Sequence, residues 1–216
     1  MYYSQCEEDK FLNDNFFKNK KNGCYIELGA LDGVLYSNTK FYEDANNWSG
    51  ILIEPHPLKF IDLQKNRSNN FLSNNLISCN TTPLTFRYFE NNCSAVSGVE
   101  NTLSKHHFDT YFESNNEWMK SQPQAKINII PITLSKVIKD SNIKHFDFLS
   151  LDVEGHELEV LQSWDFSVPI DLILIENLET DNFKSKKCYD ILINNGYLFV
   201  QKFKHNEIYV LPNIFL

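Results

Sequence analysis

The chain has 216 residues, of which 42% are hydrophobic and 14% aromatic, and its formal charge is -8 at pH 7. This length and this hydrophobic content suit one α/β domain with a sizeable core and argue against a disordered chain. The negative charge and the lack of any Lys/Arg cluster disfavour a nucleic-acid partner. No hydrophobic run approaches the ~20 residues of a membrane span, so we expect no membrane partner.

The N-terminus and the cysteines indicate a compartment. The first residues are acidic and lack the hydrophobic core of a signal peptide, and the five cysteines include no C-x-x-C pair. Free thiols in a reducing compartment fit best, so we expect a cytoplasmic protein. Lysine far outnumbers arginine, which is typical of an AT-rich genome. A microbe or a large DNA virus would fit, and for a virus the compartment would be the host cytoplasm.

Short hydrophobic runs alternate with helical patterns in the first part of the chain. Three strands are predicted there, at residues 24–28, 51–54 and 75–78. Two helices are predicted between them, at about residues 38–48 and 58–65. The first of these helices would bury Phe41, Ala45 and Trp48 on one face. Such alternation is typical of a parallel sheet with crossover helices.

The pattern breaks between about residues 81 and 125, which are polar, aromatic and irregular. A long segment of this kind predicts an insertion that serves as a lid or a binding loop. Inside it, a strand at 83–89 and a short helix at 107–119 are predicted. Further strands are predicted after it, at residues 127–130, 146–152, 172–176, 197–203 and 207–211. Helices are predicted after a Thr133 cap, after His156 and over residues 183–195.

The last two predicted strands form a hairpin. An antiparallel hairpin at one edge of a doubly wound sheet fits the seven-stranded methyltransferase architecture, whereas a plain dinucleotide-binding fold would not need it. We therefore predict an α/β fold, a Rossmann-like seven-stranded mixed sheet with a C-terminal antiparallel hairpin, of class I methyltransferase architecture. Because no repeat or linker interrupts the pattern, we expect a single domain over residues 1–216, with the insertion at about 81–125.

A glycine turn follows the first strand. Glu27 precedes the sequence Gly29-Ala-Leu-Asp-Gly33, whose G-x-x-x-G spacing differs from the G-x-G-x-x-G that binds a pyrophosphate. The carboxylate of Asp32 would also repel a phosphate. Both acids suit S-adenosylmethionine, which carries a sulfonium cation and an amino group but no phosphate. Predicted cofactor-binding residues are therefore Glu27, Gly29, Ala30, Asp32 and Gly33.

Two further strand ends complete the predicted cofactor site. Glu54 ends the second strand, 21 residues after Gly33, where a carboxylate can accept both ribose hydroxyls. Asn80 follows the third predicted strand and is expected at the edge of the adenine. The carboxyl ends of parallel strands lie on one edge of a sheet, where such folds bind ligands.

The chemistry is predicted at the end of the strand 146–152. Asp152 ends this hydrophobic run, and Glu154, His156 and Glu157 follow it. Methyl transfer to an alcohol needs a base, for which Asp152 and His156 are the candidates, with Glu154 as a third catalytic residue. As an alternative, Asp152 and Glu154 could hold Mg²⁺ and polarise a diol. Glu157 could instead cap the helix that follows.

Taken together, these residues resemble the FkbM-type methyltransferases. The matching stretches, in the family's order, are Ser4-Gln5 with Glu8-Asp9, Glu27–Gly33, Ser37–Thr39, Ile53–Pro57 and Phe148–Glu157. The resemblance implies a class I fold, S-adenosylmethionine as donor, and O-methylation of sugars or hydroxylated natural products. It implies that Gln5 and Asn38 lie beside the cofactor. Many relatives carry Asn or His where this chain has Leu31, and residues 81–125 show no clear family pattern.

The expected function is therefore an S-adenosylmethionine-dependent O-methyltransferase acting on a sugar, glycan or nucleotide-sugar hydroxyl, with a small-molecule or saccharide acceptor as partner. Two alternatives stay open here: a catalytically silent binding module with the same fold, and an NAD-dependent oxidoreductase. The missing G-x-G-x-x-G speaks against the second. Several aromatic and histidine side chains of the insertion could stack on a sugar or fill a local core: His106, His107, Phe108, Tyr111, Phe112 and Trp118.

Overall fold

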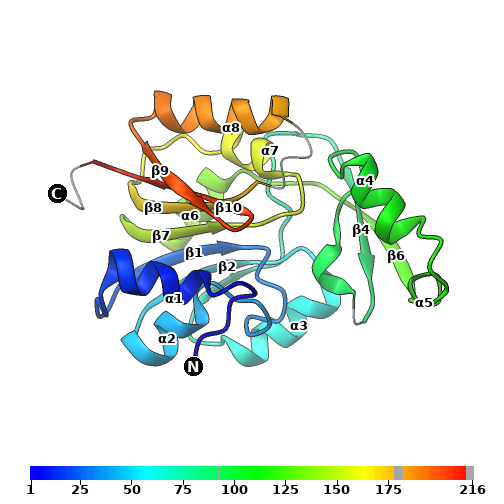
Figure 1. Ribbon diagram of the computed structural model, residues 1–216, viewed down its shortest axis with the longest axis horizontal. Coiled ribbons are helices and arrows are strands. Elements are labelled where there is room, and N and C mark those ends of the chain that lie inside the picture. Colours follow the sequence, from blue (N-terminus) through cyan, green and yellow to red (C-terminus); the bar gives the residue numbers. More distant parts are fainter. Residues whose placement is uncertain (92, 178–181, 213–216) are drawn as a thin grey trace.

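A computed structural model describes residues 1–91, 93–177 and 182–212 (Figure 1). Seven of its strands form one mixed sheet, in the order β3-β2-β1-β7-β8-β10-β9. The first five strands of this order are parallel, and the last two form an antiparallel hairpin against β8. This confirms the predicted α/β fold with its seven-stranded mixed sheet.

The strands of this sheet are β1 (Cys24–Leu28), β2 (Ser49–Ile53), β3 (Phe71–Ser73), β7 (Phe146–Leu151), β8 (Ile170–Glu176), β9 (Leu198–Phe203) and β10 (Asn206–Val210). The helices beside it are α1 (Glu8–Leu12), α2 (Lys40–Asn46), α3 (Pro57–Asn66), α6 (Leu134–Ser141), α7 (Glu157–Gln162) and α8 (Asn182–Asn194). None of the helices in the described part of the chain is both long and hydrophobic enough to cross a membrane.

Hydrophobic side chains cover both faces of the sheet, which is why its central strands are almost continuously apolar. Ile26 and Leu28 of β1 pack into the core beneath α6, α7 and α8. Tyr25, which points to the opposite face of the strand, packs into the second core beneath α1, α2 and α3. Because every residue of β7 is buried, the polar residues that follow this strand mark the edge of the sheet.

Two sequence predictions in this region are wrong. The third strand is β3 at Phe71–Ser73, and residues 75–78 make only an isolated bridge between Ile77 and Ile132. Leu76 and Ile77 are buried. These residues are hydrophobic because they pack into the core, and not because they form a strand. In α2, Tyr42 is buried while Ala45 is exposed, because the helix turns the residue next to Phe41 toward the sheet.

The segment between β3 and α6 is more regular than predicted. It forms a separate three-stranded sheet in the order β5-β4-β6, beside the carboxyl edge of the main sheet (Figure 1). The strand predicted at 127–130 belongs to this small sheet, not to the main one. Its elements are β4 (Leu84–Phe89), η2 (Ser94–Val96), β5 (Gly98–Val99), α4 (Lys105–His107), η3 (Phe108–Phe112), α5 (Glu117–Lys120) and β6 (Gln124–Ile129).

Candidate functional site

A pocket opens where β1, β2 and β7 end, with an empty volume of about 910 Å³ that includes solvent at its mouth. The small sheet forms its opposite wall, through Phe86 and Val99 among others. The pocket therefore lies at the carboxyl edge of the sheet, as predicted. Its acidic and imidazole side chains are Glu27, Glu54, Asp152, Glu154 and His156.

Glu27 lies at the base of the pocket and is buried. Its carboxylate accepts hydrogen bonds from the Asn38 backbone N–H at 2.7 Å and from the Thr39 hydroxyl at 2.6 Å, and it also accepts from Ser37. Burial raises the pKa of Glu27, while the Arg67 guanidinium, 3.9 Å away, lowers it. The carboxylate thus holds the 37–39 turn in place and brings Asn38 to the pocket wall, where Gln5 also lies.

The glycine turn divides into two parts with different roles. Gly29 lines the pocket and has a φ of 79°, which favours glycine. Ala30 is buried behind it and donates its N–H to the Ile53 carbonyl at 3.2 Å. Leu31 also lines the pocket, with a φ of 47°. Leucine adopts this left-handed conformation at a cost that Asn or Gly would largely avoid.

Asp32 and Gly33 do not line the pocket, contrary to the expectation that they contact the cofactor. The Asp32 carboxylate accepts the backbone N–H groups of Val34 and Leu35 at 2.9 and 2.8 Å, so it closes the turn. A Cβ atom on Gly33 would lie 2.5 Å from Cγ of the buried Arg67. Asp32 and Gly33 therefore stabilise the turn on the side that faces away from the pocket.

Glu54 is buried at the end of β2 and lines the pocket. Its carboxylate accepts hydrogen bonds from the backbone N–H groups of Leu31 and His56, each at 2.8 Å. Burial raises the pKa of Glu54 to about 7, against these two hydrogen bonds. Glu54 thus ties the glycine turn to the end of β2, at the place predicted for the ribose.

Asn80 does not lie at the pocket. It is exposed, and its side chain donates a hydrogen bond to Ser78 at 3.2 Å. Because β3 ends at Ser73, the residues that follow the strand end and line the pocket are Asn75, Leu76 and Ile77. The contact between Asn80 and the adenine stays a prediction, and Asn80 lies outside the residues that line this pocket.

Three carboxylates gather at the ends of β7 and β8. Oxygen atoms of Asp152, Glu154 and Glu176 all lie within 4.8 Å of one another. Burial, followed by the charges of the neighbouring acids, raises the pKa values of Glu154 and Glu176 far above the usual range. Burial raises the pKa of Asp152 to about 6, while its hydrogen bond with Glu176 lowers it. Asp152 is therefore the carboxylate that ionises first, and magnesium binding by Asp152 and Glu154 stays a prediction.

His156 and Glu157 have separate roles beside these acids. Burial, followed by the charge of Lys184, lowers the pKa of His156 to about 4, so its imidazole is neutral at pH 7. Glu157 accepts the backbone N–H groups of Val153 and Gly155 at 3.1 Å each, and so fixes the loop after β7. Of the two base candidates, Asp152 has a pKa of about 6 and His156 one of about 4, so the pKa of Asp152 is the closer to neutral pH.

The sequence analysis missed two residues of this site, Glu176 and the partner of Glu154, His107. Glu176 ends a hydrophobic run just as Asp152 does, so the same signal would have found it. His107 lies 3.4 Å from a Glu154 oxygen through Nδ1, and its Nε2 bonds the Val96 carbonyl. His107 is buried and packs against Tyr111 and Phe112, so it contributes to the local core that was the alternative to stacking on a sugar. The pocket lining includes none of the insertion's predicted stacking side chains, namely His106, His107, Phe108, Tyr111, Phe112 and Trp118.

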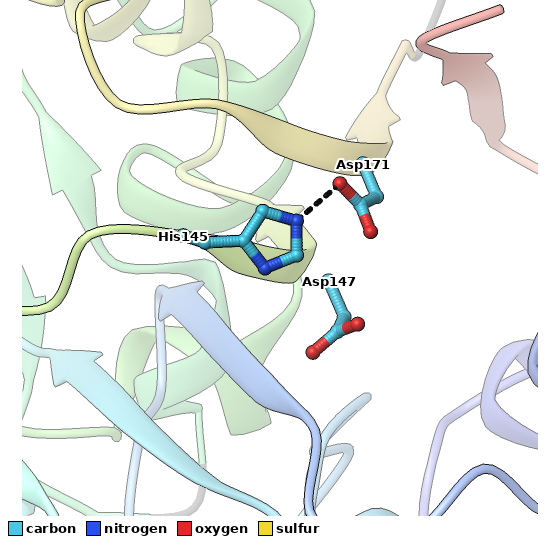
Figure 2. Close-up of side chains that lie close together, drawn as sticks. All are labelled: His145, Asp147 and Asp171. Atoms are coloured by element: carbon cyan, nitrogen blue, oxygen red, sulfur yellow. Dashed lines mark hydrogen bonds and ion pairs between the residues drawn. The ribbon is translucent and has the colours of Figure 1, made fainter. Parts of the chain in front are cut away.

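Figure 2 shows a second group of titratable side chains, where β7 and β8 begin and thus at the opposite edge of the sheet. His145 Nε2 lies 2.6 Å from an Asp171 oxygen. Asp147 accepts hydrogen bonds from the Lys20 ammonium and from the Cys24 backbone N–H. Because Lys20 and His145 already pair with the two buried aspartates, this group ties the strand beginnings together.

Comparison with known proteins places the chain in a family. The family model described as the methyltransferase FkbM domain matches residues 27–208. No curated protein matches the sequence. Among solved structures, the Aeropyrum pernix fibrillarin with natively bound S-adenosyl-L-methionine aligns with a TM-score of 0.49 at 12% identity, over 97% of this chain and 74% of that chain. A precorrin-6y C5,15-methyltransferase from Geobacter metallireducens gives a TM-score of 0.37 at 12% identity, over 88% of this chain and 80% of that one.

The family match covers both the glycine turn and the acids after β7, the two parts of the chain that meet in the pocket. It supports S-adenosylmethionine as the donor and a methyltransferase over an NAD-dependent oxidoreductase. The chain belongs to the FkbM methyltransferase family, a class I family that depends on S-adenosylmethionine.

Proposed function

We propose that the protein transfers the methyl group of S-adenosylmethionine to a hydroxyl of a sugar, glycan or nucleotide-sugar. The observation that carries this proposal is Asp152, an acid with a raised pKa that lines the same pocket as Glu54 and Gly29. A base with a pKa of about 6 is largely ionised at neutral pH and still accepts a proton from an attacking alcohol.

The pocket residues fit the donor. Gly29 and Glu54 line the same pocket, which supports a role for Gly29 in letting the ligand approach the backbone and for Glu54 as partner of the ribose hydroxyls. The acids of the pocket also favour the sulfonium cation, which supplies an electrophilic methyl group. The acceptor oxygen forms a bond to that methyl carbon as the carbon–sulfur bond breaks, and sulfur keeps the electron pair. Asp152 takes the hydroxyl proton, and the positions of both partners supply much of the rate.

The small sheet would form the acceptor side of the pocket. Phe86 and Val99 offer it hydrophobic surface, and Ser94 and Ser97 offer hydroxyls. A sugar ring presents both kinds of surface, so this wall suits a saccharide. We propose that the insertion at about 81–125 serves as the lid or binding loop expected from the sequence.

Methyl transfer from radiolabelled S-adenosylmethionine to a panel of saccharides and nucleotide-sugars tests the proposal. The expected product is a methyl ether, which survives mild base, whereas a methyl ester does not. Donor binding without a labelled product across the panel would favour the catalytically silent module instead. Label on nitrogen rather than oxygen would contradict the role given to Asp152.

A further inference from the structure

Two buried aspartates face each other where β7 and β8 begin (Figure 2). Phe148 pairs with Leu172, one residue further along each strand, so Asp147 lies opposite Asp171. Asp147 is 5% exposed and Asp171 is 3% exposed. Like charges directly opposite each other on neighbouring strands are destabilising, and a buried charge needs a partner of opposite sign. This pair of carboxylates therefore calls for a cation.

Two basic side chains approach the aspartates, and both are half exposed. The Lys20 ammonium pairs with Asp147, and the lysine side chain is 47% exposed. Nε2 of His145 lies 2.6 Å from an Asp171 oxygen, and the histidine side chain is 48% exposed. An ion pair whose cation remains in solvent contributes little to stability. An ion that arrives from solvent can therefore displace Lys20 from Asp147 at low cost.

The Asp147 carboxylate is already held in position for a second partner. One of its oxygens accepts a hydrogen bond from the Cys24 backbone N–H at 2.7 Å, and the other oxygen pairs with Lys20. A hydrogen bond of this kind orients a carboxylate that binds a metal ion. The oxygen beside Lys20 becomes available when the lysine leaves, while the oxygen bonded to Cys24 keeps the side chain in place.

Three of these side chains converge as the ligands of a metal ion would. His145, Asp147 and Asp171 each place a ligand atom within 4.8 Å of the other two. His145 comes two residues before Asp147, so the alternation along the chain places both side chains on one side, and Asp171 reaches them from β8. One imidazole nitrogen and two carboxylate oxygens suit Zn²⁺, with water completing the coordination. The nitrogen disfavours Mg²⁺ and Ca²⁺, which prefer oxygen.

We propose that His145, Asp147 and Asp171 bind a divalent transition-metal ion such as Zn²⁺ in place of the Lys20 ammonium. The two carboxylates balance the charge of the ion, and the neutral imidazole exchanges its hydrogen bond to Asp171 for a bond to the metal. The ion joins β7 to β8 at the edge of the sheet opposite the pocket, so its role is structural. The proposal does not depend on the proposed methyl transfer.

Calorimetric titration of the metal-free protein with Zn²⁺ tests this proposal. His145→Ala removes one of the three protein ligands, so the dissociation constant of Zn²⁺ should increase by at least about tenfold. Asp171→Asn should change it in the same direction, because an amide carries no charge. His106→Ala removes an exposed histidine outside the group and should leave the affinity for Zn²⁺ unchanged.

The variant Lys20→Met gives a change in the opposite direction. It removes the ammonium that competes for Asp147, so Zn²⁺ should bind at least about threefold more tightly. Lys21→Met is the matched control, because the Lys21 ammonium bonds the Ala45 carbonyl and Asn46 instead, and it should leave the affinity unchanged. A gain in affinity cannot come from a variant that fails to fold.

Thermal unfolding gives a second readout. With Zn²⁺ at about 100 times its dissociation constant, the melting temperature of the wild type should rise by about 5 °C or more, and that of His145→Ala should not. Undiminished Zn²⁺ binding in His145→Ala would place the ion elsewhere, for example at the acids of the pocket, and would overturn the proposal. A wild type that binds no Zn²⁺, or an unchanged affinity in Lys20→Met, would overturn it as well.

Discussion

Gly29 and Asp152 touch: a Cβ atom on Gly29 would lie 1.9 Å from the backbone carbonyl oxygen of Asp152. The two residues end the neighbouring parallel strands β1 and β7, and the Asp152 N–H donates to the Leu28 carbonyl at 3.4 Å. The missing side chain at Gly29 therefore lets the strand end that carries the proposed base approach the turn that carries the donor.

Gly29→Ala should disrupt this contact. The new Cβ would meet backbone that cannot rotate away, at a φ of 79° that an L-residue adopts at a cost. We expect a loss of more than about 3 kcal/mol in the free energy of unfolding, measured by urea titration. Gly196→Ala is the matched control: its φ is 88° but nothing lies within 4 Å of the added Cβ, so the loss should be only about 1 kcal/mol. Equal losses in the two variants would contradict the contact.

The buried acids predict that stability falls as the pH rises. Burial raises the pKa values of Glu54 and Glu157 from 4.5 to about 7, and these two contributions outweigh the opposite one of His156, whose pKa burial lowers to about 4. The folded state therefore binds more protons than the unfolded chain in this window, and the stabilisation is lost as the pH rises through it. Urea titrations should show a free energy of unfolding that is lower at about pH 8 than at about pH 5 by about 2 to 4 kcal/mol.

The variant Glu157→Gln checks the origin of that slope. Its amide oxygen can still accept the N–H groups of Val153 and Gly155, but it has no charge to desolvate. The fall in stability between pH 5 and pH 8 should therefore shrink by about 1 kcal/mol or more. An equally steep fall in Glu157→Gln and in the wild type would show that Glu157 does not contribute to the slope.

Glu54→Ala should weaken donor binding. The change removes the proposed partner of the ribose hydroxyls and also frees the Leu31 and His56 N–H groups that Glu54 accepts. The dissociation constant of S-adenosylhomocysteine should increase about tenfold to a hundredfold, measured by calorimetry. Asp62→Ala, an exposed acid on α3, is the control and should leave it unchanged. Unchanged affinity in Glu54→Ala would place the ribose elsewhere.

A chelator should leave methyl transfer unchanged if Asp152 acts as a base. The proposed proton transfer needs one ionised carboxylate and no metal ion. Initial rates measured with and without excess EDTA should therefore agree. A rate lost in EDTA and restored by added Mg²⁺ would favour the alternative in which Asp152 and Glu154 bind the metal.

The parts of the fold that could be predicted from sequence are those with a local signal. The strand 24–28 is flanked by glycines at 23 and 29, and its residues are almost all buried, so its bounds were predicted correctly. The final hairpin was predicted from two hydrophobic runs separated by a short polar turn. The predicted cap at Thr133 is also present, because its hydroxyl accepts a hydrogen bond from the Lys136 N–H at 3.1 Å. Glu54 and Asp152 were predictable because each directly follows a hydrophobic strand.

The features that the sequence could not predict depend on contacts between distant segments. A parallel edge strand as short as β3 has no period to recognise, so the buried pair Leu76-Ile77 attracted the prediction of a strand and, with it, the predicted adenine contact at Asn80. The small sheet pairs β4 with β6 across the insertion. The bond between Thr102 and His156 joins residues 54 positions apart, which no local pattern reports.

The central claim is that Asp152 promotes methyl transfer in a pocket that binds the donor independently of it. The most direct test measures S-adenosylhomocysteine affinity and the rate of labelled methyl transfer side by side, in the wild type and in Asp152→Asn. The account predicts a dissociation constant within about threefold of the wild type and a rate at least about 100-fold lower, as expected for a missing general base. Methyl transfer by Asp152→Asn at the wild-type rate would contradict it.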